Sequence, residues 1–392
     1  MLTVNDAAVR LKRGELVIVP TETVYGIAAD ATNPDAVAKL DKAKQRADGK
    51  HYSWLIACLD DVTKLVEITP EARELYAAFS PGPMTMVLRK FDDIDRQTVG
   101  LRSPDHAITL KLLRELGFPL ACPSANLSGQ APPTRFDDAV SNFDGAVAAL
   151  DGGDCTLGIE STVIDMTAKP PHILRRGALS KRDIKNVIGA TPSGVTVLGI
   201  TGGTGSGKTT ALNALKALGA TVLDCDAVYH ELLSDAEMLD EIEARFAGVI
   251  NDSMLDRKAL GAIVFADAAA LRDLGAITHK YIDREIFKVI RRLEALGGSP
   301  VVALDAIALI ESGLYKSCDH MTAVTAPRET RIARIIVRDG INREYAVSRI
   351  DAQKPDEFYA DNCDATLSNN GSEREFFEHC TAHFKNVIYE LT

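Results

Sequence analysis

Apolar runs alternate with amphipathic stretches through the first 179 residues. Residues 5–12 have the apolar spacing of a helix, and residues 15–20 form a short apolar run typical of a buried strand. Further strands are predicted at 54–59 and 84–88, with a helix between them. Alternation of this kind predicts an α/β fold for the N-terminal half.

The C-terminal half repeats the alternation in a more regular order. A buried strand is predicted over residues 195–200, a helix over 210–218 and a second strand over 220–223. Later strands are predicted at 300–304 and 321–325. Strands that alternate with helices favour a parallel sheet, because a parallel connection needs a crossover segment.

A segment of different character separates the two patterns. Residues 181–195 begin with a stretch compatible with a short helix and end in Gly-Ala-Thr-Pro-Ser-Gly, a composition typical of a linker. We therefore predict two domains, residues 1–180 and 196–392, joined by this linker. A chain of 392 residues is long enough to bury two cores.

Composition narrows the class of protein. The apolar fraction of 46% and the charged fraction of 25% are those of an ordinary globular protein. Residues 1–195 hold 23 basic and 25 acidic side chains, and residues 196–392 hold 21 and 30. Neither half has the basic charge of a nucleic-acid binder, so we expect no direct DNA binding.

Cysteine usage and hydropathy indicate the cellular compartment of the protein. The seven cysteines show no C-x-x-C spacing, which indicates neither a zinc site nor a disulfide framework. The N-terminus lacks a basic-then-apolar signal pattern, and no apolar run reaches membrane-spanning length. We predict a cytoplasmic protein without membrane association.

One motif in the middle of the chain is highly specific. Residues 202–209 fit G-x-x-x-x-G-K-[ST], with a predicted strand before and a predicted helix after. In this loop, backbone N–H groups surround a phosphate, the lysine neutralises its charge and the final hydroxyl binds Mg²⁺. The residues predicted to bind ATP are Gly203, Thr204, Gly205, Ser206, Gly207, Lys208, Thr209 and Thr210, with Thr209 as the Mg²⁺ ligand.

Carboxylates follow two predicted strands of this half. Asp224 and Asp226 come at the end of the second strand, where a substrate of an open α/β sheet binds. A carboxylate there can accept the proton of an attacking hydroxyl or hold Mg²⁺, although capping of the next helix is an equal alternative for either residue taken singly. Asp305 ends a later strand and is a candidate metal ligand.

Four arginines recur at helical spacing after the last predicted strand: Arg328, Arg331, Arg334 and Arg338. An arginine-rich helix that folds over the phosphates is one way in which small kinases stabilise transferred charge and exclude water. A solvated basic face is the alternative, and we favour it for Arg328 and Arg331.

Together these features resemble dephospho-CoA kinase over residues 196–392. The resemblance also depends on four further segments, at 255–265, 277–279, 305–313 and 364–371. It implies a P-loop kinase with a parallel sheet and a helical lid, which phosphorylates the ribose 3′-hydroxyl of dephospho-CoA with ATP.

The same resemblance implies roles for individual residues. Asp226, with Asp224, would orient or deprotonate the hydroxyl, and Lys208 would hold the phosphates. Arg334 and Arg338 would belong to the lid. Cys225 stands where the family usually has alanine, and residues 306–309 also depart from the family sequence. His279 is either a substrate contact or a buried structural histidine.

Six short polar motifs lie in the N-terminal half. They include a hydroxyl-rich turn at 20–26, two cations at 44–46 that suit a polyphosphate, and a polar loop at 123–129. The others lie at residues 99–102, 158–163 and 173–177. Taken singly, each is typical of an ordinary loop or a solvated surface.

As an ordered set, these motifs resemble the YrdC family, the threonylcarbamoyl-AMP synthases, over about residues 3–180. The resemblance implies a twisted mixed sheet with helices. It also implies that L-threonine, bicarbonate and ATP are converted to threonylcarbamoyl-AMP and pyrophosphate. That product feeds the tRNA-modifying threonylcarbamoyl transferase proteins, so a functional link to them is implied.

The resemblance assigns two groups of site residues. Those implied to contact ATP are Lys44, Arg46, Ser124 and Arg175, and those implied around threonine are Thr23, Arg102, Ser161 and Asn126. No nucleophilic side chain is required, so catalysis would consist of positioning and charge neutralisation around Mg²⁺. Residues 47–54 and Arg176 depart from the usual family sequence.

Three hypotheses follow for the whole chain. The first, which we adopt, is a bifunctional enzyme with two independent active sites. The second keeps the kinase but makes the N-terminal half an RNA-binding or regulatory module, which its lack of net positive charge and its few aromatic residues disfavour. The third treats the C-terminal half as an NTPase switch, which the aspartate pair and the arginine-rich helix disfavour.

Overall fold

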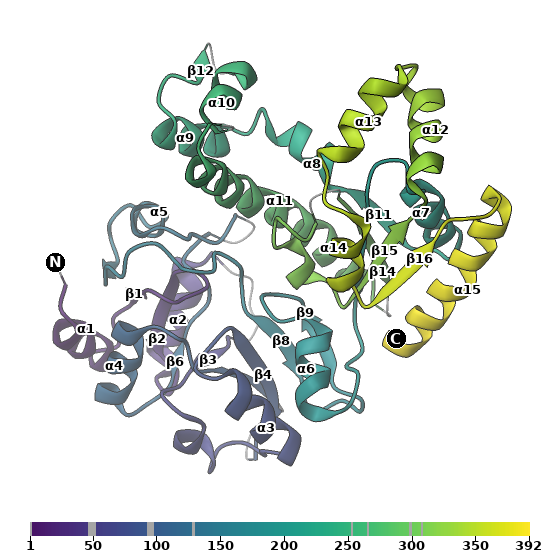
Figure 1. Cartoon of the computed structure of the whole chain (residues 1–392). Helices are drawn as coiled ribbons and strands as arrows, with labels where there is room; N and C mark the ends of the chain where they lie inside the picture. The colour runs from purple at the N-terminus through teal and green to yellow at the C-terminus, as the bar shows by residue number, and fades with distance from the viewer. Residues whose placement is uncertain are drawn as a thin grey trace. The chain divides into compact units, whose positions relative to one another are not determined.

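The computed structural model describes residues 2–45, 52–91, 98–127, 130–251, 254–264, 266–297, 300–306 and 309–392. The chain forms two compact units, Met1–Ser193 and Gly194–Thr392 (Figure 1). Both units consist of helices packed on a β-sheet, so the predicted α/β class is confirmed. In the described part of the chain, no helix is both long enough and apolar enough to cross a membrane.

The first unit contains a nine-stranded sheet in the order β7-β1-β2-β6-β3-β5-β4-β8-β9. The strands are β1 Val17–Val19, β2 Gly26–Asp30, β3 Trp54–Leu55, β4 Met84–Arg89, β5 Thr98–Arg102, β6 Leu120–Ala121, β7 Ala148–Ala149, β8 Thr162–Asp165 and β9 His172–Arg175. Parallel pairs such as β4 with β8 alternate with antiparallel pairs such as β4 with β5. The sheet is therefore mixed, as predicted.

The helices of this unit are α1 Val4–Lys12, α2 Pro34–Ala43, α3 Pro70–Phe79, α4 Ala107–Leu116, α5 Phe136–Ser141 and α6 Lys181–Ile188. Helix α1 begins with a capping box, in which the Thr3 hydroxyl accepts from the Asp6 amide and the Asp6 carboxylate accepts from the Thr3 amide. Helices α1 and α4 pack together over the apolar residues of β1 and β2. The core of the unit thus lies between its helices and its sheet.

The strand predicted over residues 54–59 is wrong in its length. Only Trp54–Leu55 pairs in the sheet, and a 3₁₀ helix follows at Leu59–Val62. The Asp61 carboxylate accepts a hydrogen bond from the Cys58 amide at 3.0 Å, which turns the chain out of the sheet. An apolar run alone cannot reveal this local competition for the backbone.

The first part of the predicted linker is helix α6. Its Ser180 cap, buried Ile184 and left-handed Gly189 give it an ordinary beginning and end. It packs against α3 inside the first unit, and Ile184 belongs to the same apolar cluster as Leu75. The boundary between the compact units falls after Ser193.

The second unit has a five-stranded sheet in the order β11-β14-β10-β15-β16, in which every pair is parallel. The strands are β10 Thr196–Thr201, β11 Thr221–Asp224, β14 Val301–Asp305, β15 His320–Thr325 and β16 Ala365–Ser368. Strand β10 is central and buried along its whole length. The predicted parallel sheet is confirmed.

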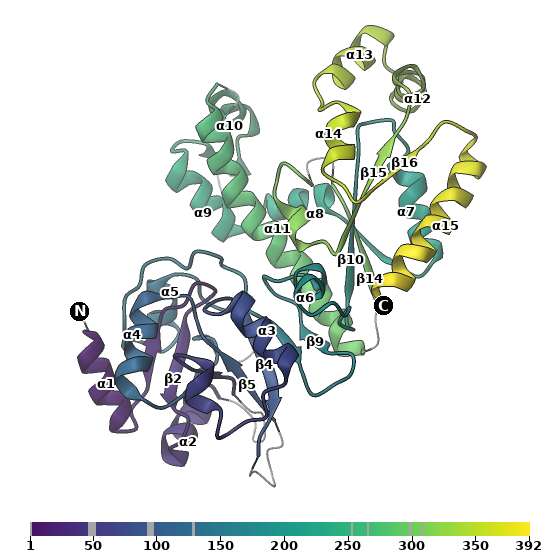
Figure 2. The same ribbon diagram turned by 60° about the horizontal axis from the view of Figure 1, so that its bottom comes forward.

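Helices cover both faces of this sheet. Helices α7 Lys208–Ala217 and α15 Glu373–Leu391 pack together on one face, and α8 Cys225–Leu232 and α14 Asp356–Asp361 lie on the other (Figure 2). A helical group extends from the sheet and consists of α9 Ala236–Arg245, α10 Arg257–Val264 and α11 Ala268–Leu296, with a short hairpin formed by β12 Ile250–Asn251 and β13 Met254–Leu255.

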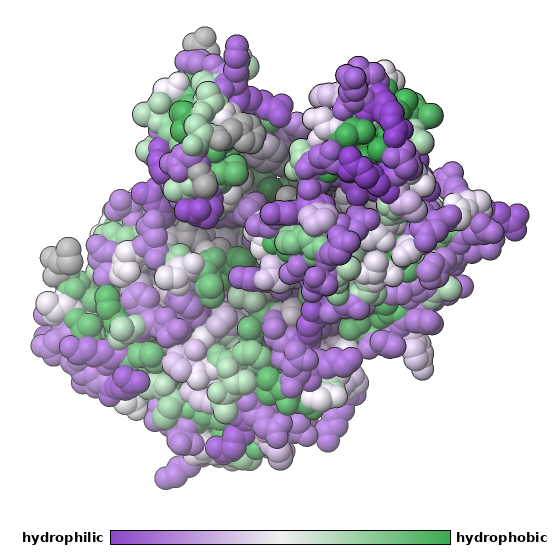
Figure 3. Space-filling model, in the orientation of Figure 1, coloured by the Kyte–Doolittle hydropathy of each residue, from purple (hydrophilic) through white to green (hydrophobic). Residues whose placement is uncertain are grey.

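A helical hairpin follows β15. Helices α12 Arg328–Asp339 and α13 Arg343–Asp351 contact one another through a small apolar cluster that includes Ile332 and Ile350. In the space-filling view, strongly hydrophilic residues gather over this hairpin (Figure 3).

Candidate active sites

The phosphate-binding loop connects the end of β10 to the start of α7. Gly207 has a φ of 107°, and a Cβ atom there would lie 2.1 Å from Asn369 Nδ2, so glycine is required. Lys208 Nζ donates to the carbonyl oxygen of Gly202 at 2.9 Å. The N-terminus of α7 and the lysine together provide the positive end that attracts a phosphate.

A cavity of about 620 Å³ opens in front of this loop. Its lining comes from the loop, from the ends of β11 and β14, from α12, α13 and α15, and from the end of β16. The residues are Gly203, Thr204, Gly205, Gly207, Lys208, Thr209, Thr210, Asp224, Asp226, Asp305, Arg334, Arg338, Arg349, Asn369 and Glu373. The structure thus brings most of the predicted kinase residues to one cavity, although Ser206 is fully buried behind it.

The acidic side of the cavity is formed by neighbouring strand ends. Asp224 and Asp305 are directly paired positions of β11 and β14. Burial raises the pKa of Asp305, and burial together with the charge of Asp224 raises the pKa of Asp226. Burial also lowers the pKa of Lys208, and the two carboxylates Asp305 and Asp226 oppose that effect. Charges of both signs therefore converge where a phosphoryl group could be transferred.

Asp224 and Asp226 differ in their local contacts. The Asp224 carboxylate caps helix α8 by accepting from the Ala227 amide at 3.0 Å. The capping alternative therefore applies to Asp224. Asp226 lies two residues further on, in the first turn of α8, and also lines a second cavity of about 180 Å³, with Tyr229, His279 and Ser312 among its neighbours. Asp226 is thus placed between a phosphate cavity and an adjoining, more apolar one.

His279 lies in the lining of this second cavity. Burial lowers its pKa, so the neutral imidazole is favoured near neutral pH. The remaining lining residues are Cys225, Thr278, Ile282, Ala306 and Leu314. A neutral imidazole in a cavity of this kind can exchange hydrogen bonds with an uncharged group of a substrate.

The arginines of α12 differ in their exposure and in their contacts. Arg328 is half exposed and pairs with Asp351, as the solvated-face interpretation predicts. That interpretation is wrong for Arg331, whose side chain is only 5% exposed and contacts the phosphate-binding loop. Arg334 reaches the carbonyl oxygens of Gly205 and Ser206 at 3.3 Å, and Arg338 lines the cavity.

Three further residues belong to this site, and none has a predicted role, although Asn369 lies in the segment 364–371 on which the kinase resemblance depends. Arg349 on α13 lines the cavity and pairs with Asp339 at 2.5 Å. Asn369, after β16, donates to the carbonyl oxygen of Ser206 at 2.9 Å. Gln353 contacts Thr204 through two hydrogen bonds. All three are far from the loop in sequence and no short motif links them to it.

The donor set at the acidic side fits Mg²⁺. Thr209 offers a hydroxyl and Asp226 and Asp305 offer carboxylates in one cavity, and hydroxyl and carboxylate oxygens are the ligands that Mg²⁺ prefers. Among the described residues, no cluster of three or more His, Cys, Asp or Glu side chains forms a metal site by itself. Kinase Mg²⁺ sites do not need one, because substrate phosphates and water complete the coordination.

The first unit contains a buried cluster of threonines and charged residues near the turn after β1. Arg102, at the end of β5, forms a buried ion pair with Glu22 at 2.8 Å and donates to the Thr23 hydroxyl at 2.8 Å. The Thr21 hydroxyl lies 2.9 Å from that of Thr23 and donates to the Val24 carbonyl oxygen at 2.6 Å. The hydroxyls of Thr21 and Thr23 are therefore fixed on this turn, and the Arg102 guanidinium is held against it.

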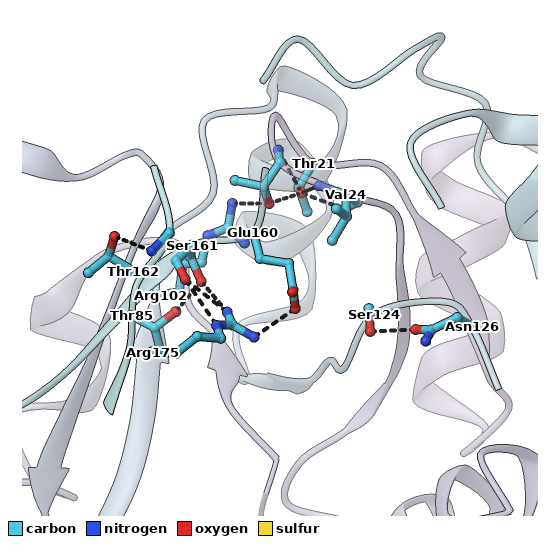
Figure 4. A network of polar contacts seen from close by, with 12 residues as sticks. Thr21, Val24, Thr85, Arg102, Ser124, Asn126, Glu160, Ser161, Thr162 and Arg175 are labelled. Carbon is cyan, nitrogen blue, oxygen red and sulfur yellow. Dashed lines mark hydrogen bonds and ion pairs between the residues drawn. The ribbon is translucent and has the colours of Figure 1, made fainter. Parts of the chain in front are cut away.

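A second part of this cluster lies at the junction of β8 and β9. Arg175 pairs with Glu160 at 2.7 Å and donates to the Ser161 hydroxyl at 3.0 Å. The same hydroxyl lies 2.8 Å from that of Thr85 on β4. Figure 4 shows the side chains of Arg102, Arg175 and Ser161 in one group, with the Ser124–Asn126 pair to one side.

Lys44 is held by the polar loop at 123–129. Its ammonium donates to the carbonyl oxygen of Ser124 at 2.6 Å and to two oxygens of Asn126. The Ser124 hydroxyl donates to Asn126 Oδ1 at 2.5 Å. The Lys44 side chain is almost fully buried, and its hydrogen bonds fix the conformation of the loop. Arg46, its predicted partner in ATP binding, lies outside the described residues.

These contacts bring seven of the eight predicted synthase residues into one region of the first unit. Glu22, Thr85 and Glu160 support them and were not predicted. Two guanidinium groups and several hydroxyls lie close together, and the Lys44 ammonium is bonded to Ser124 and Asn126 beside them. Such a set suits a ligand that carries a carboxylate and phosphates. By its fold, the chain is a two-unit α/β enzyme with a P-loop in its second unit.

Two family models match the chain, one to each unit. A model described as telomere recombination (Sua5, YciO and YrdC) matches residues 9–177, and a model described as dephospho-CoA kinase matches residues 196–375. The threonylcarbamoyl-AMP synthase of Pyrococcus abyssi is 33% identical over 316 residues, which cover 76% of this chain and 88% of that protein. The dephospho-CoA kinase of Geobacter sulfurreducens is 38% identical over 184 residues, which cover 46% and 92%.

Two further proteins are similar to this chain. The Bacillus subtilis threonylcarbamoyl-AMP synthase is 40% identical over 205 residues, which span 48% of this chain and 58% of that protein. The crystal structure of P. abyssi Sua5 complexed with L-threonine is 26% identical and covers 82% of this chain and 96% of that one, with a TM-score of 0.49. The chain belongs to the threonylcarbamoyl-AMP synthase family through its first unit and to the dephospho-CoA kinase family through its second. The predicted fusion is confirmed.

Proposed function

We propose that both units are active, so that one chain catalyses two separate reactions. The first unit converts L-threonine, bicarbonate and ATP to threonylcarbamoyl-AMP and pyrophosphate, for the tRNA-modifying threonylcarbamoyl transferase proteins. The second unit transfers the γ-phosphoryl group of ATP to the ribose 3′-hydroxyl of dephospho-CoA. Family membership and the two clusters of polar residues support both assignments.

For the kinase, the observation that carries the proposal is the position of Asp226. This carboxylate lines both the phosphate cavity and the adjoining smaller cavity. An acceptor hydroxyl in the smaller cavity would meet Asp226 as the base that takes its proton, opposite a phosphate held by Lys208. Arg334 and Arg338 would neutralise charge that develops on the transferred group.

Mg²⁺ would supply a further positive charge on the phosphates. The Thr209 hydroxyl, with Asp305, would hold it. The chain's own contribution is to place the acceptor, to keep Lys208 at the phosphates and to exclude water when the hairpin of α12 and α13 folds over the cavity.

For the synthase, the carrying observation is the buried contact between Arg102 and the Thr23 hydroxyl. A guanidinium held by a carboxylate can bind the carboxylate of an amino acid, and the nearby hydroxyls of Thr23 and Ser161 can orient its amine and side chain. Lys44, Arg46, Ser124 and Arg175 would bind ATP. Because no side chain acts as a nucleophile, the site would act by orientation and charge neutralisation.

The deciding experiment measures pyrophosphate release by the purified chain with ATP, Mg²⁺ and bicarbonate, with and without L-threonine. Threonine-dependent release is expected. In the same preparation, Lys208→Ala should abolish CoA formation and leave pyrophosphate release unchanged, and Arg46→Ala should do the reverse. Loss of both activities in either folded variant would contradict two independent sites.

An active kinase without threonine-dependent pyrophosphate would favour a different role for the first unit, as an RNA-binding or regulatory module. RNA binding could then be measured directly with the Lys208→Ala chain. The net charge of the first 195 residues, with 23 basic against 25 acidic side chains, disfavours this alternative.

A further inference from the structure

Thr204, in the middle of the phosphate-binding loop, is held by two residues that the proposed mechanism does not use. Its amide donates to Gln353 Oε1 at 2.8 Å, and Gln353 Nε2 donates to its hydroxyl at 2.7 Å. Arg331 Nε donates to its carbonyl oxygen at 3.0 Å. Every polar group of Thr204 therefore takes part in a contact with the segment that follows β15.

Arg331 completes this cluster from a buried position. Its side chain is 5% exposed, and its charge is compensated by Asp356 at 2.9 Å. A further donor of the same guanidinium reaches Gln353 Oε1 at 3.1 Å. The planar fork of donors thus joins the loop, the segment after α13 and the start of α14 in one network.

The loop has glycine where it meets Arg331. A Cβ atom on Gly203 would lie 2.1 Å from Arg331 Nη2. Gly205 has a φ of 80°, and a Cβ atom there would lie 2.9 Å from the Arg331 carbonyl oxygen. The phosphate-binding motif leaves both positions open, so the close approach of α12 gives a separate reason for these glycines.

We propose that Arg331 and Gln353 are positioning residues of the kinase. Through their contacts with Thr204 they fix the conformation of the phosphate-binding loop, and they couple the loop to the segment α12–α14. The proposal rests on the kinase function proposed above. With the Thr204 carbonyl turned toward Arg331, and those of Gly205 and Ser206 toward Arg334, the loop keeps its carbonyl oxygens away from the phosphates. The Thr204 amide is bonded to Gln353 and the Ser206 amide donates to the Gly203 carbonyl oxygen at 3.2 Å, so anion binding falls to the other amides of the loop and the start of α7.

The coupling has a direct consequence for the lid. Arg334 and Arg338 lie on the helix that carries Arg331, and Arg349 lies on the helix that precedes Gln353. Occupation of the loop by phosphate should therefore order the whole segment Arg328–Asp361. Without the Gln353 contact, the loop should still bind ATP, but ATP binding should no longer order residues 328–361.

The test uses the full chain with Gln353→Ala and Gln353→Glu. ATP binding is measured by calorimetry without acceptor, and hydrogen exchange is followed over the loop and over residues 328–361. We expect Gln353→Ala to weaken ATP binding roughly tenfold, because two hydrogen bonds that fix the loop are lost. ATP should then protect the loop while protecting residues 328–361 less than in the unmodified chain.

Gln353→Glu retains the acceptor for the Thr204 amide and loses the donor to its hydroxyl, so an intermediate effect is expected. Arg328→Ala, on the helix that carries Arg331, is the control, because Arg328 is half exposed and contacts Asp351 rather than the loop. It should bind ATP like the unmodified chain. Thr204→Val combined with Gln353→Ala should lose little more than Gln353→Ala alone.

Two results would overturn the inference. One is unchanged ATP affinity and unchanged protection in Gln353→Ala. The other is an equal loss of affinity for ATP and for dephospho-CoA with a lowered melting temperature, which would show a role in stability alone. Failure of the kinase assignment would be seen separately, as absence of CoA formation by the unmodified chain, while the ATP-binding comparison would still be valid.

Discussion

At the scale of single residues, Asp224 and Asp226 belong to one acidic cluster but have different roles. Asp224 caps α8 and contributes charge, whereas Asp226 faces both cavities. Burial first, and the charge of Asp224 second, raises the pKa of Asp226. A base with a raised pKa accepts a proton more readily, provided that it is ionised at the working pH.

This division predicts a shift in the pH profile of the kinase. Protonation of Asp226 at low pH removes the base, so kcat/KM falls as the pH drops through the pKa of Asp226. Asp224→Asn retains the cap on α8 and removes a neighbouring negative charge, so the pKa of Asp226 falls. We expect the acidic limb of the profile of kcat/KM for dephospho-CoA to move to lower pH.

The control is Asp267→Asn, which changes a similar cap at the start of α11. Its pH profile should match that of the unmodified chain. An acidic limb that stays in place in Asp224→Asn would mean that Asp226 is not the titrating base.

At the scale of elements, short connections between strands hold the synthase residues in place. Gly177, just after β9, lies against the segment that precedes β8. A Cβ atom on Gly177 would be 2.2 Å from the carbonyl oxygen of Glu160 and 2.5 Å from the Thr162 amide nitrogen. These are backbone atoms, which cannot turn aside as a flexible side chain would.

Gly177→Ala should therefore displace Glu160 and Ser161 and separate them from Arg175. We expect threonine-dependent pyrophosphate release to fall at least tenfold, as for misplaced groups in an active site, with CoA formation unchanged. The first unit should lose about 1–3 kcal/mol of stability from the forced contact. Trp54, the single tryptophan of the chain, reports urea unfolding of that unit by fluorescence.

Gly145→Ala provides the matched control. Gly145, unlike Gly177, has a left-handed φ, of 68°, but a Cβ atom there would meet nothing within 4 Å. It should cost only about 1 kcal/mol and leave pyrophosphate release intact. Equal effects of the two substitutions would remove the close approach at Gly177 as the cause.

At the scale of the whole molecule, each unit has its own apolar core. Apolar clusters around Leu75, Leu11 and Ile27 lie in the first unit, and those around Phe384 and Ile335 lie in the second. The division between units falls at Ser193–Gly194. A unit that buries a sheet and its helices in this way has what a domain needs to fold by itself.

Separation of the chain at that point should therefore preserve both reactions. Residues 1–193 alone should release pyrophosphate in response to threonine, and residues 194–392 alone should form CoA, each with the turnover of the full chain. Unfolding of either fragment, measured by circular dichroism, would show that the units depend on one another. A cut after residue 180 should instead destabilise the first unit, because it removes α6 from α3.

Much of this protein can be predicted from local sequence. The phosphate-binding loop depends on consecutive residues between a strand and a helix, so its motif predicts both its position and its chemistry. The parallel order of the second sheet follows from alternating strands and helices. The eight synthase residues are implied by the resemblance of the ordered motifs to the YrdC family, and the seven that are described lie in one region.

Tertiary structure decided what depends on contacts between distant segments. The sequence shows Arg331 as one of four similarly spaced cations, and only packing buries it against Thr204 and Asp356. Gln353 and Asn369 reach the loop across more than 100 residues of chain, and of the two only Asn369 lies in a segment that supports the kinase resemblance. The free-energy cost of an unpartnered charge or amide depends on how deeply the group is buried and on which distant residue pairs with it. The periodicity of the sequence gives neither the burial nor the partner.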